Sequence, residues 1–201
     1  MQMKTSLITT LRNQNSSTAQ FREAAELVAE LLAWETAQTL DYSAQPVQTP
    51  LATTEGSYLE HSVVLIPILR AGLSMLNPFL KVFKEAAVGF IGLKRDESTA
   101  MASLYYQSLP VIGPSDYVIL LDPMLATGGS CAMAIDLLLE QQVQPKQIRY
   151  VSALASSPGL RAVRKRYPDL QFVIAQEDPE LNAKKYIVPG LGDWGDRYFK
   201  T

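Results

Sequence analysis

Hydrophobic residues follow two alternating patterns along most of this chain. Short continuous apolar runs rich in Val and Ile predict strands that are buried on both faces. Between them lie stretches with an apolar period near 3.6 residues, which predict helices. The expected strands are residues 63–69, 87–93, 117–121, 148–155 and 170–175. The expected helices are residues 72–83, 130–141 and 158–167, the last with Ser157 as its N-cap. This alternation predicts an α/β fold in which a parallel sheet is flanked by helices on both faces.

Three other segments depart from that alternation. Residues 17–40 predict one amphipathic helix, with Ser17 and Gln20 spaced as a capping box. Trp34 lies in this predicted helix, and we expect its side chain to pack against the core. Residues 42–60 carry two prolines and a glycine and predict a connector that contains a loose hairpin. Residues 94–110 are polar, follow neither period and are long for a connection, so they predict a flexible arm.

Composition and charge narrow the function classes. The chain has 201 residues, enough for a single domain with its own core. A net charge of −2 without a basic stripe argues against a nucleic-acid binder. Cys131 is the single cysteine, which excludes an internal disulfide and a Cys-rich metal site. Because no apolar run approaches the length of a membrane span, we expect a cytoplasmic protein with neither nucleic-acid nor membrane partners.

The most informative motif is the LDPMLATGGS segment at residues 121–130. It lies between a predicted buried strand and a predicted helix, where ligands of parallel sheets bind. Its two consecutive glycines allow backbone N–H groups to approach a phosphate at the helix N-terminus. Thr127 and Ser130 offer hydroxyl donors, and Asp122 is placed to accept hydrogen bonds from a sugar. A plain strand-to-helix turn with Ser130 as N-cap is the alternative.

Two further motifs fall at the same side of the predicted sheet. Arg70 ends one strand and Arg95 follows the next, and the planar guanidinium fork suits phosphate oxygens. Surface arginines at turns are the alternative for both. Near the C-terminus, residues 186–196 combine three glycines and a proline with two aspartates, which predicts a rigid loop whose backbone faces a ligand. A glycine-rich terminal turn is the alternative there.

Taken together, these segments resemble the uracil phosphoribosyltransferases, a family of type I phosphoribosyltransferases. The likeness rests on PILRAG at 67–72, DPMLATGGS at 122–130 and YIVPGLGD at 186–193, and it extends from about Leu11 to the end. It implies the type I phosphoribosyltransferase fold, with a small hood formed by the N-terminal helix and the C-terminal loop. Residues 1–60 and about 176–201 would contribute to this hood within a single domain, 1–201.

The resemblance also implies a reaction. The enzyme would transfer ribose 5-phosphate from 5-phospho-α-D-ribose 1-diphosphate (phosphoribosyl pyrophosphate, PRPP) to N1 of uracil, giving UMP and diphosphate in pyrimidine salvage. Mg²⁺ would be the cofactor, held mainly by the diphosphate, with no protein ligand assigned. The partners would be uracil, PRPP and further copies of the chain, as a dimer or tetramer. A purine nucleotide is a candidate activator.

Matching positions assign the site residues under this resemblance. Arg70, Arg95, Asp122 and Asp193 would be catalytic, with the two arginines on the pyrophosphate. Uracil would be bound by Ile187, Gly192, Asp193 and Trp194. The residues that would bind PRPP are Arg70, Arg95, Asp122, Pro123, Met124, Leu125, Ala126, Thr127, Gly128, Gly129, Ser130 and Asp193.

The chain departs from the family pattern at two places. Trp194 stands where a small residue, commonly Ala, is usual, and Ser108 in the arm stands where a Lys is usual. The indole could fill the base pocket, reshape it or turn outward and pack elsewhere. A catalytically altered relative that binds PRPP or a nucleotide in a regulatory role is therefore the alternative to an active enzyme.

Overall fold

The structure, a computed structural model, describes residues 2–95 and 102–201. The helices are α1 Gln2–Arg12, α2 Thr18–Ala37, α3 Leu73–Val82, α4 Gly129–Glu140, α5 Ser157–Arg166 and α6 Trp194–Phe199, with a 3-10 turn at Pro145–Gln147. The strands are β1 Tyr42–Gln48, β2 Thr53–Leu59, β3 Val63–Leu69, β4 Ala87–Val88, β5 Phe90–Arg95, β6 Ala102–Ser108, β7 Tyr117–Leu121, β8 Met124–Leu125, β9 Ile148–Ser156, β10 Gln171–Asp178, β11 Glu180–Leu181 and β12 Ile187–Val188.

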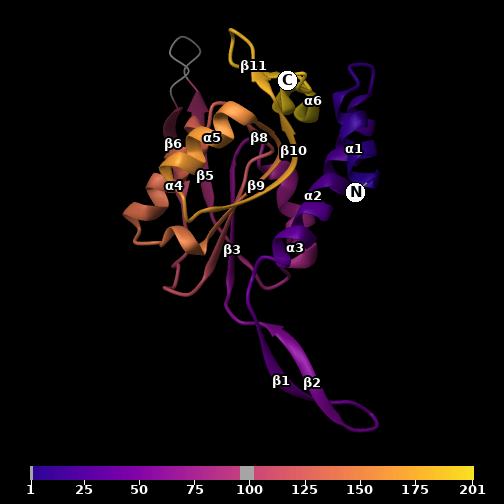
Figure 1. Ribbon diagram of the computed structural model, residues 1–201, viewed down its shortest axis with the longest axis vertical. Helices are drawn as coiled ribbons and strands as arrows, with labels where there is room; N and C mark the ends of the chain where they lie inside the picture. Colours follow the sequence, from indigo (N-terminus) through magenta and orange to yellow (C-terminus); the bar gives the residue numbers. More distant parts are fainter. Residues whose placement is uncertain (1, 96–101) are drawn as a thin grey trace.

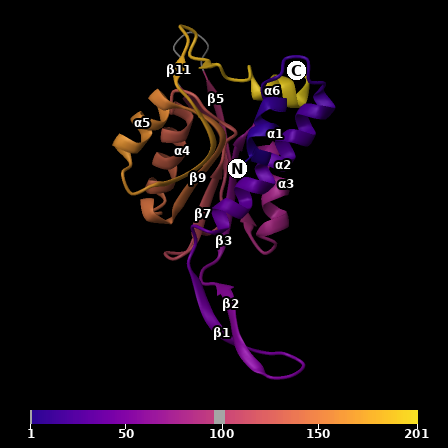
Figure 2. The same ribbon diagram turned by 45° about the vertical axis from the view of Figure 1, so that its right-hand side comes forward.

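A central sheet forms the middle of three layers (Figures 1 and 2). Its strand order is β10-β9-β7-β3-β5-β6, with β4 beside β3 and β8 beside β9. The pairs are parallel except β5 with β6, which is antiparallel. Helices α1 to α3 cover one face of the sheet and α4 and α5 cover the other. The predicted α/β fold with helices on both faces is confirmed.

The uninterrupted apolar runs supply two cores from the same strands. In β7, Ile119 packs in the core beneath α1 to α3, whereas Val118 and Leu120 pack in the core beneath α4 and α5. Successive strand side chains point to opposite faces, so a strand buried on both sides must be apolar at every position. The arrangement places the carboxyl ends of β3, β7 and β9 at one edge of the sheet.

The N-terminal part contains one predicted helix and one that the sequence patterns did not predict. In α2, Ser17 and Gln20 form the predicted capping box. Helix α1 precedes it and buries only Ile8 and Leu11, so its apolar stripe is narrow. The predicted hairpin is present as β1 and β2, which pair over seven positions and project away from the other layers (Figure 1). None of the helices in the described ranges is both long and apolar enough to cross a membrane.

The predicted arm at 94–110 differs in structure from the sequence expectation. Residues 102–108 form strand β6, which pairs with β5 from Phe90–Ser108 to Arg95–Ala102. Residues 96–101 lie outside the described residues. Strand β6 could not be predicted from an alternation of apolar and polar residues. Nearly all its side chains are exposed on this edge strand, so it has no apolar face.

Candidate active site

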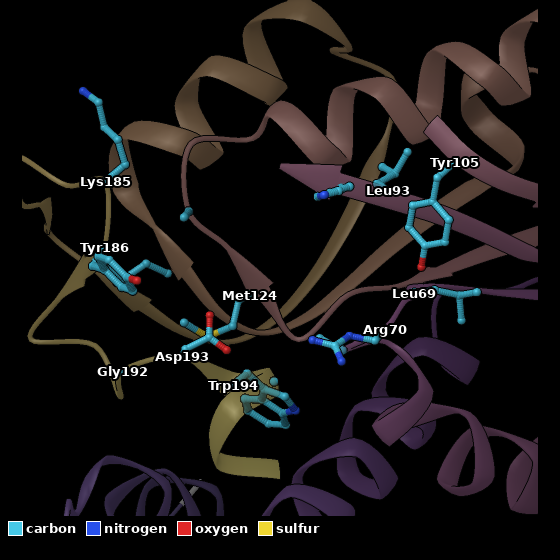
Figure 3. Close-up of a pocket in the computed structure, with 15 residues that line it drawn as sticks. Leu69, Arg70, Leu93, Tyr105, Met124, Lys185, Tyr186, Gly192, Asp193 and Trp194 are labelled. Carbon is cyan, nitrogen blue, oxygen red and sulfur yellow. The ribbon is translucent and has the colours of Figure 1, made fainter. Parts of the chain in front are cut away.

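A cavity of about 750 Å³ opens at the edge of the sheet where β3 and β7 end. Four segments border it: the turn after β3, the loop after β7, the β5–β6 hairpin and the C-terminal loop. Figure 3 shows Arg70 and Asp193 pointing into it from different segments. The sequence-predicted site residues that line it are Arg70, Met124, Ala126, Ile187, Gly192, Asp193 and Trp194.

The turn after β3 presents Arg70 to this cavity. Arg70 is exposed, and the carbonyl of this residue accepts the 3.1 Å bond from Leu73 N that begins α3. The Leu69–Arg70 peptide bond is cis. Only glycine fits at position 72, because a Cβ there would lie 2.3 Å from the carbonyl oxygen of Leu121. The close approach therefore seats the Arg70 turn directly against the end of β7.

The loop after β7 is held by the corner between β9 and α5. Ser156 Oγ donates a 2.5 Å hydrogen bond to the carbonyl of Ala126 and accepts one of 3.0 Å from Gly159 N. Gly128 has φ +85° and is the N-cap of α4. A Cβ there would lie 2.4 Å from Cγ2 of Val163. The loop is a fixed turn that requires glycine at 128, as a phosphate-binding turn needs.

The structure corrects two capping assignments made from sequence. Ser130 is not the N-cap of α4, because Gly128 occupies that position and Ser130 lies inside the helix. Ser156, not Ser157, caps α5. The plain-turn alternative for the loop, which depended on Ser130 as cap, therefore fails in its stated form.

Asp122 sits at the end of β7 with a buried tyrosine as partner. Tyr150 is fully buried and its hydroxyl donates a 2.7 Å hydrogen bond to Oδ2 of Asp122, which is 8% exposed. Burial is the main cause that raises the pKa of Tyr150 well above its ordinary value, so its hydroxyl stays a donor at neutral pH. The role of Asp122 on the sugar hydroxyls stays a prediction.

The other predicted PRPP residues divide between packing and loop backbone. Leu125 is buried in the core beneath α4 and α5, and the carbonyl of Pro123 accepts a 3.0 Å bond from Leu154 N. Thr127 Oγ1 accepts a 3.4 Å bond from Gly129 N. Arg95 is the last residue of β5, and its side chain lies outside the described part of the structure.

The C-terminal loop reaches the cavity through three special backbone positions. Gly190 and Gly192 have φ of +61° and +85°, and the Val188–Pro189 peptide is cis. A Cβ on Gly190 would lie 2.0 Å from the carbonyl oxygen of Ile187, so this turn also requires glycine. Asp193 is exposed and caps α6 by accepting a 2.9 Å bond from Asp196 N.

Trp194 packs inward, away from solvent. Its indole is 2% exposed and meets the ring of Phe21 edge-on, with the centroids 5.2 Å apart. Its Nε1 donates a 3.0 Å hydrogen bond to Ser74 Oγ. None of the three alternatives drawn from sequence fits in full, because the indole is buried rather than turned outward and still lines a cavity of about 750 Å³.

Sequence reasoning missed several residues at the cavity. Tyr105 of β6 lines it, and its ring lies over Gly92, where a Cβ would meet Tyr105 Cζ at 2.7 Å. Lys185 and Tyr186 line the opposite side (Figure 3). An aromatic pair within an otherwise polar arm was the available signal for Tyr105. Lys185 offered none, because its place depends on a turn with φ +65°.

Solved structures with this fold define the class of protein. The hypoxanthine-guanine phosphoribosyltransferase of Bacillus anthracis superposes with a TM-score of 0.52 at 13% identity, over 80% of each chain. At that identity the likeness shows the fold alone, which is that of the type I phosphoribosyltransferases. The AQ2163 protein of Aquifex aeolicus is nearer, with a TM-score of 0.89 at 34% identity over 98% of this chain and 93% of that one.

Sequence comparisons then identify the family. The family model described as uracil phosphoribosyltransferase matches residues 2–201. Curated uracil phosphoribosyltransferases are similar over nearly their whole length. That of Campylobacter curvus is 42% identical over 95% of this chain and 91% of its own, and that of Thermosipho africanus is 40% identical over 96% and 93%. The chain belongs to the uracil phosphoribosyltransferase family.

Proposed function

We propose that this protein transfers ribose 5-phosphate from PRPP to N1 of uracil, giving UMP and diphosphate. The observation that carries the proposal is that one cavity is bordered by the Arg70 turn, the loop after β7 and the C-terminal loop. These three segments also carry the motifs of the family to which the chain belongs. PRPP, which carries a charged group at each end, would contact two of these segments. Uracil, a flat polar base, would contact the third.

We assign the charged ends of PRPP to two of the segments. The backbone and hydroxyls of residues 122–130 would hold the ribose and its 5-phosphate, with the N-terminus of the 12-residue helix α4 behind them. Arg70 would hold the diphosphate from the neighbouring turn, and Arg95 would approach it from β5. The packing of Gly72 against Leu121 fixes the distance between the Arg70 turn and the loop after β7.

Bond breaking at the anomeric carbon explains why positive charge is needed beside the diphosphate. As the bond between C1 of the ribose and the diphosphate oxygen breaks, positive charge develops on the sugar and negative charge on the leaving group. N1 of uracil forms the new bond to C1, and the proton that N1 gives up leaves on the released diphosphate. Arg70 stabilises the departing diphosphate, and the loop after β7 holds the sugar in line for attack.

Uracil recognition is assigned to the C-terminal loop. Backbone groups of Ile187 and Gly192–Trp194, held by the turns at Gly190 and Gly192, would pair with O2, N3 and O4 of the base. Cytosine would present a mismatched donor, and a buried polar group without a partner is costly. This accounts for specificity without any side chain that reads the base.

The donor set fits a Mg²⁺ ion that arrives with its substrate. Within the described ranges, no group of three or more His, Cys, Asp or Glu side chains could hold a metal by itself. Asp193 is exposed at the cavity, and Mg²⁺ is commonly bound by one or two carboxylates plus substrate phosphates. When bound, the ion would neutralise charge on the leaving diphosphate.

Location, assembly and regulation lie beyond what the cavity itself supports. A cytoplasmic location suits a substrate whose phosphates cannot cross a bilayer. A homo-oligomer and a purine nucleotide activator stay predictions. The regulatory alternative was motivated by Trp194 and by the changed arm at Ser108. The inward packing of the indole gives that alternative no support.

Incubation of the purified protein with labelled uracil, PRPP and Mg²⁺ tests the proposal. We expect UMP and diphosphate in equal amounts, and no release of diphosphate when uracil is omitted. Absence of UMP over a range of pH and Mg²⁺ concentrations, with PRPP binding intact by calorimetry, would reject it.

A further inference from the structure

Two hydrogen bonds in series connect the C-terminal loop to the Arg70 turn. Trp194 Nε1 donates to Ser74 Oγ at 3.0 Å, and Ser74 Oγ donates to the carbonyl of Ala71 at 2.7 Å. Ala71 follows Arg70 directly, and its carbonyl also accepts the 3.1 Å bond from Ser74 N. A buried indole on one side of the cavity is therefore bonded, through one hydroxyl, to the backbone that carries Arg70 on the other side.

Because these two hydrogen bonds are buried, they favour one relative position of the C-terminal loop and the Arg70 turn. Trp194 is 2% exposed and Ser74 is 4% exposed, so neither polar group can exchange its partner for bulk water. The indole has a single N–H, which is a donor only, and the serine hydroxyl both accepts and donates. If either loop shifts, a buried polar group loses its partner, and the loops are thereby held in register.

The ring of Trp194 is itself held from the far side. Phe21 of α2 contacts it edge-on, and the Arg197 guanidinium lies 4.4 Å from the centre of the Phe21 ring. Arg197 also donates to the carbonyl of Leu191 at 2.9 Å, within the C-terminal loop. The indole is therefore held from α2 through Phe21, and the same ring contacts the arginine that binds the C-terminal loop.

We propose that Trp194 and Ser74 are positioning residues that couple the Arg70 turn to the base-side loop, so that diphosphate bound at Arg70 sets the geometry of the uracil site. The proposal rests on the proposed function for the identity of the two ligands. The coupling itself needs only a ligand that engages Arg70, and inorganic diphosphate with Mg²⁺ serves as that probe.

Tryptophan fluorescence gives a direct readout. The chain has two tryptophans, and Trp34 is 58% exposed in a separate pocket that lies away from the Arg70 turn. In Trp34→Phe, emission comes from Trp194 alone. We expect magnesium diphosphate to shift or quench that emission without uracil present. In Trp34→Phe/Ser74→Ala the change should be lost, while calorimetry still detects diphosphate binding.

Kinetics supply a second test that does not depend on one variant. Trp194→Phe keeps an aromatic ring against Phe21 but removes the N–H. We expect Trp194→Phe and Ser74→Ala each to raise the KM for PRPP about tenfold, ~1.4 kcal/mol, at saturating uracil. The double variant should be no worse than the poorer single variant, because both break the same link. Thr36→Val is the matched control, since it deletes a buried hydroxyl bonded to Leu32 far from both loops.

The outcomes separate the two proposals. Unchanged Trp194 emission with diphosphate bound, the same emission change with and without Ser74, or independent kinetic losses that multiply would each overturn the coupling. A wild-type protein that makes no UMP yet shows the Ser74-dependent emission change would overturn the proposed function and leave the coupling in place.

Discussion

Arg12, the last residue of α1, forms a two-point ion pair with Asp178, the last residue of β10. Its Nη1 and Nη2 lie 2.7 and 2.5 Å from the two carboxylate oxygens. Asp178 is 2% exposed and also accepts a 2.8 Å bond from Gly190 N, and Arg12 donates to the Gly190 carbonyl at 2.8 Å. The pair therefore fastens the C-terminal loop to the first helix, close to the positions assigned to uracil.

Arg12→Leu tests the energetic weight of this pair. Removal of the guanidinium leaves a buried carboxylate without its counter-charge, which costs about 3 kcal/mol of unfolding free energy. Urea unfolding measures it. Arg166→Leu is the matched control, because the Arg166–Asp136 pair has side chains 57% and 38% exposed and should contribute less than about 1 kcal/mol. Equal losses in the two variants would contradict the assignment.

The two adjacent glycines of the loop after β7 should respond differently to alanine. In Gly128→Ala the alanine would have to adopt a φ of +85°, and its Cβ would lie 2.4 Å from Cγ2 of Val163. The free energy of unfolding should therefore fall by about 2 kcal/mol. A Cβ on Gly129 would lie 3.6 Å from Thr127 Oγ1, an ordinary contact, so Gly129→Ala should fold normally. If the loop holds the 5-phosphate, Gly129→Ala should still weaken PRPP binding. Calorimetry showing unchanged affinity in a folded Gly129→Ala protein would argue against that role.

Arg70→Gln tests the diphosphate grip. Loss of one charged donor to the developing charge of the leaving group should lower kcat/KM by about a hundredfold or more. Thermal unfolding should hardly change, because the Arg70 side chain is exposed. Arg161→Gln, an exposed arginine on α5, is the control and should keep full activity. An active Arg70→Gln enzyme would remove Arg70 from the mechanism.

Alkaline pH should weaken the fold through Cys131. Burial raises the pKa of this thiol well above its ordinary value, so the native state keeps a proton that the unfolded state loses first as pH rises. The unfolded state then binds fewer protons, and the free energy of unfolding falls with pH above about 8.5. Cys131→Ser does not titrate there and should show a shallower fall between pH 8 and 10. Parallel curves in urea unfolding would contradict this.

The central strands could be predicted from sequence because they are apolar along their length, and most helices because their apolar residues repeat every 3.6 positions. A run such as Tyr117–Leu121 is apolar at every position only when both faces of the sheet are covered. Helix α1 and strand β6 could not be predicted, since each depends on long-range partners rather than on an apolar face of its own. Arg12 and Asp178, separated by 166 positions, illustrate the kind of contact that no local pattern contains.

The candidate site shows the same division. The motifs around Arg70, Asp122 and Asp193 could be placed on loops from the chain alone, and the structure brings these loops to one edge of the sheet. The setting of Trp194 could not be predicted, because its partners Phe21 and Ser74 come from two other helices. Trp34 was expected to pack and is instead 58% exposed.

The choice of base tests the central claim most directly, since purine enzymes share this fold. The measurement is kcat/KM for uracil, cytosine and hypoxanthine as acceptors with PRPP and Mg²⁺, by the wild-type protein under one set of conditions. We predict that uracil exceeds the other two by at least about a hundredfold, because a mismatched base leaves buried polar groups unpaired. A kcat/KM for hypoxanthine comparable to that for uracil, or no product from any of the three bases, would contradict the account.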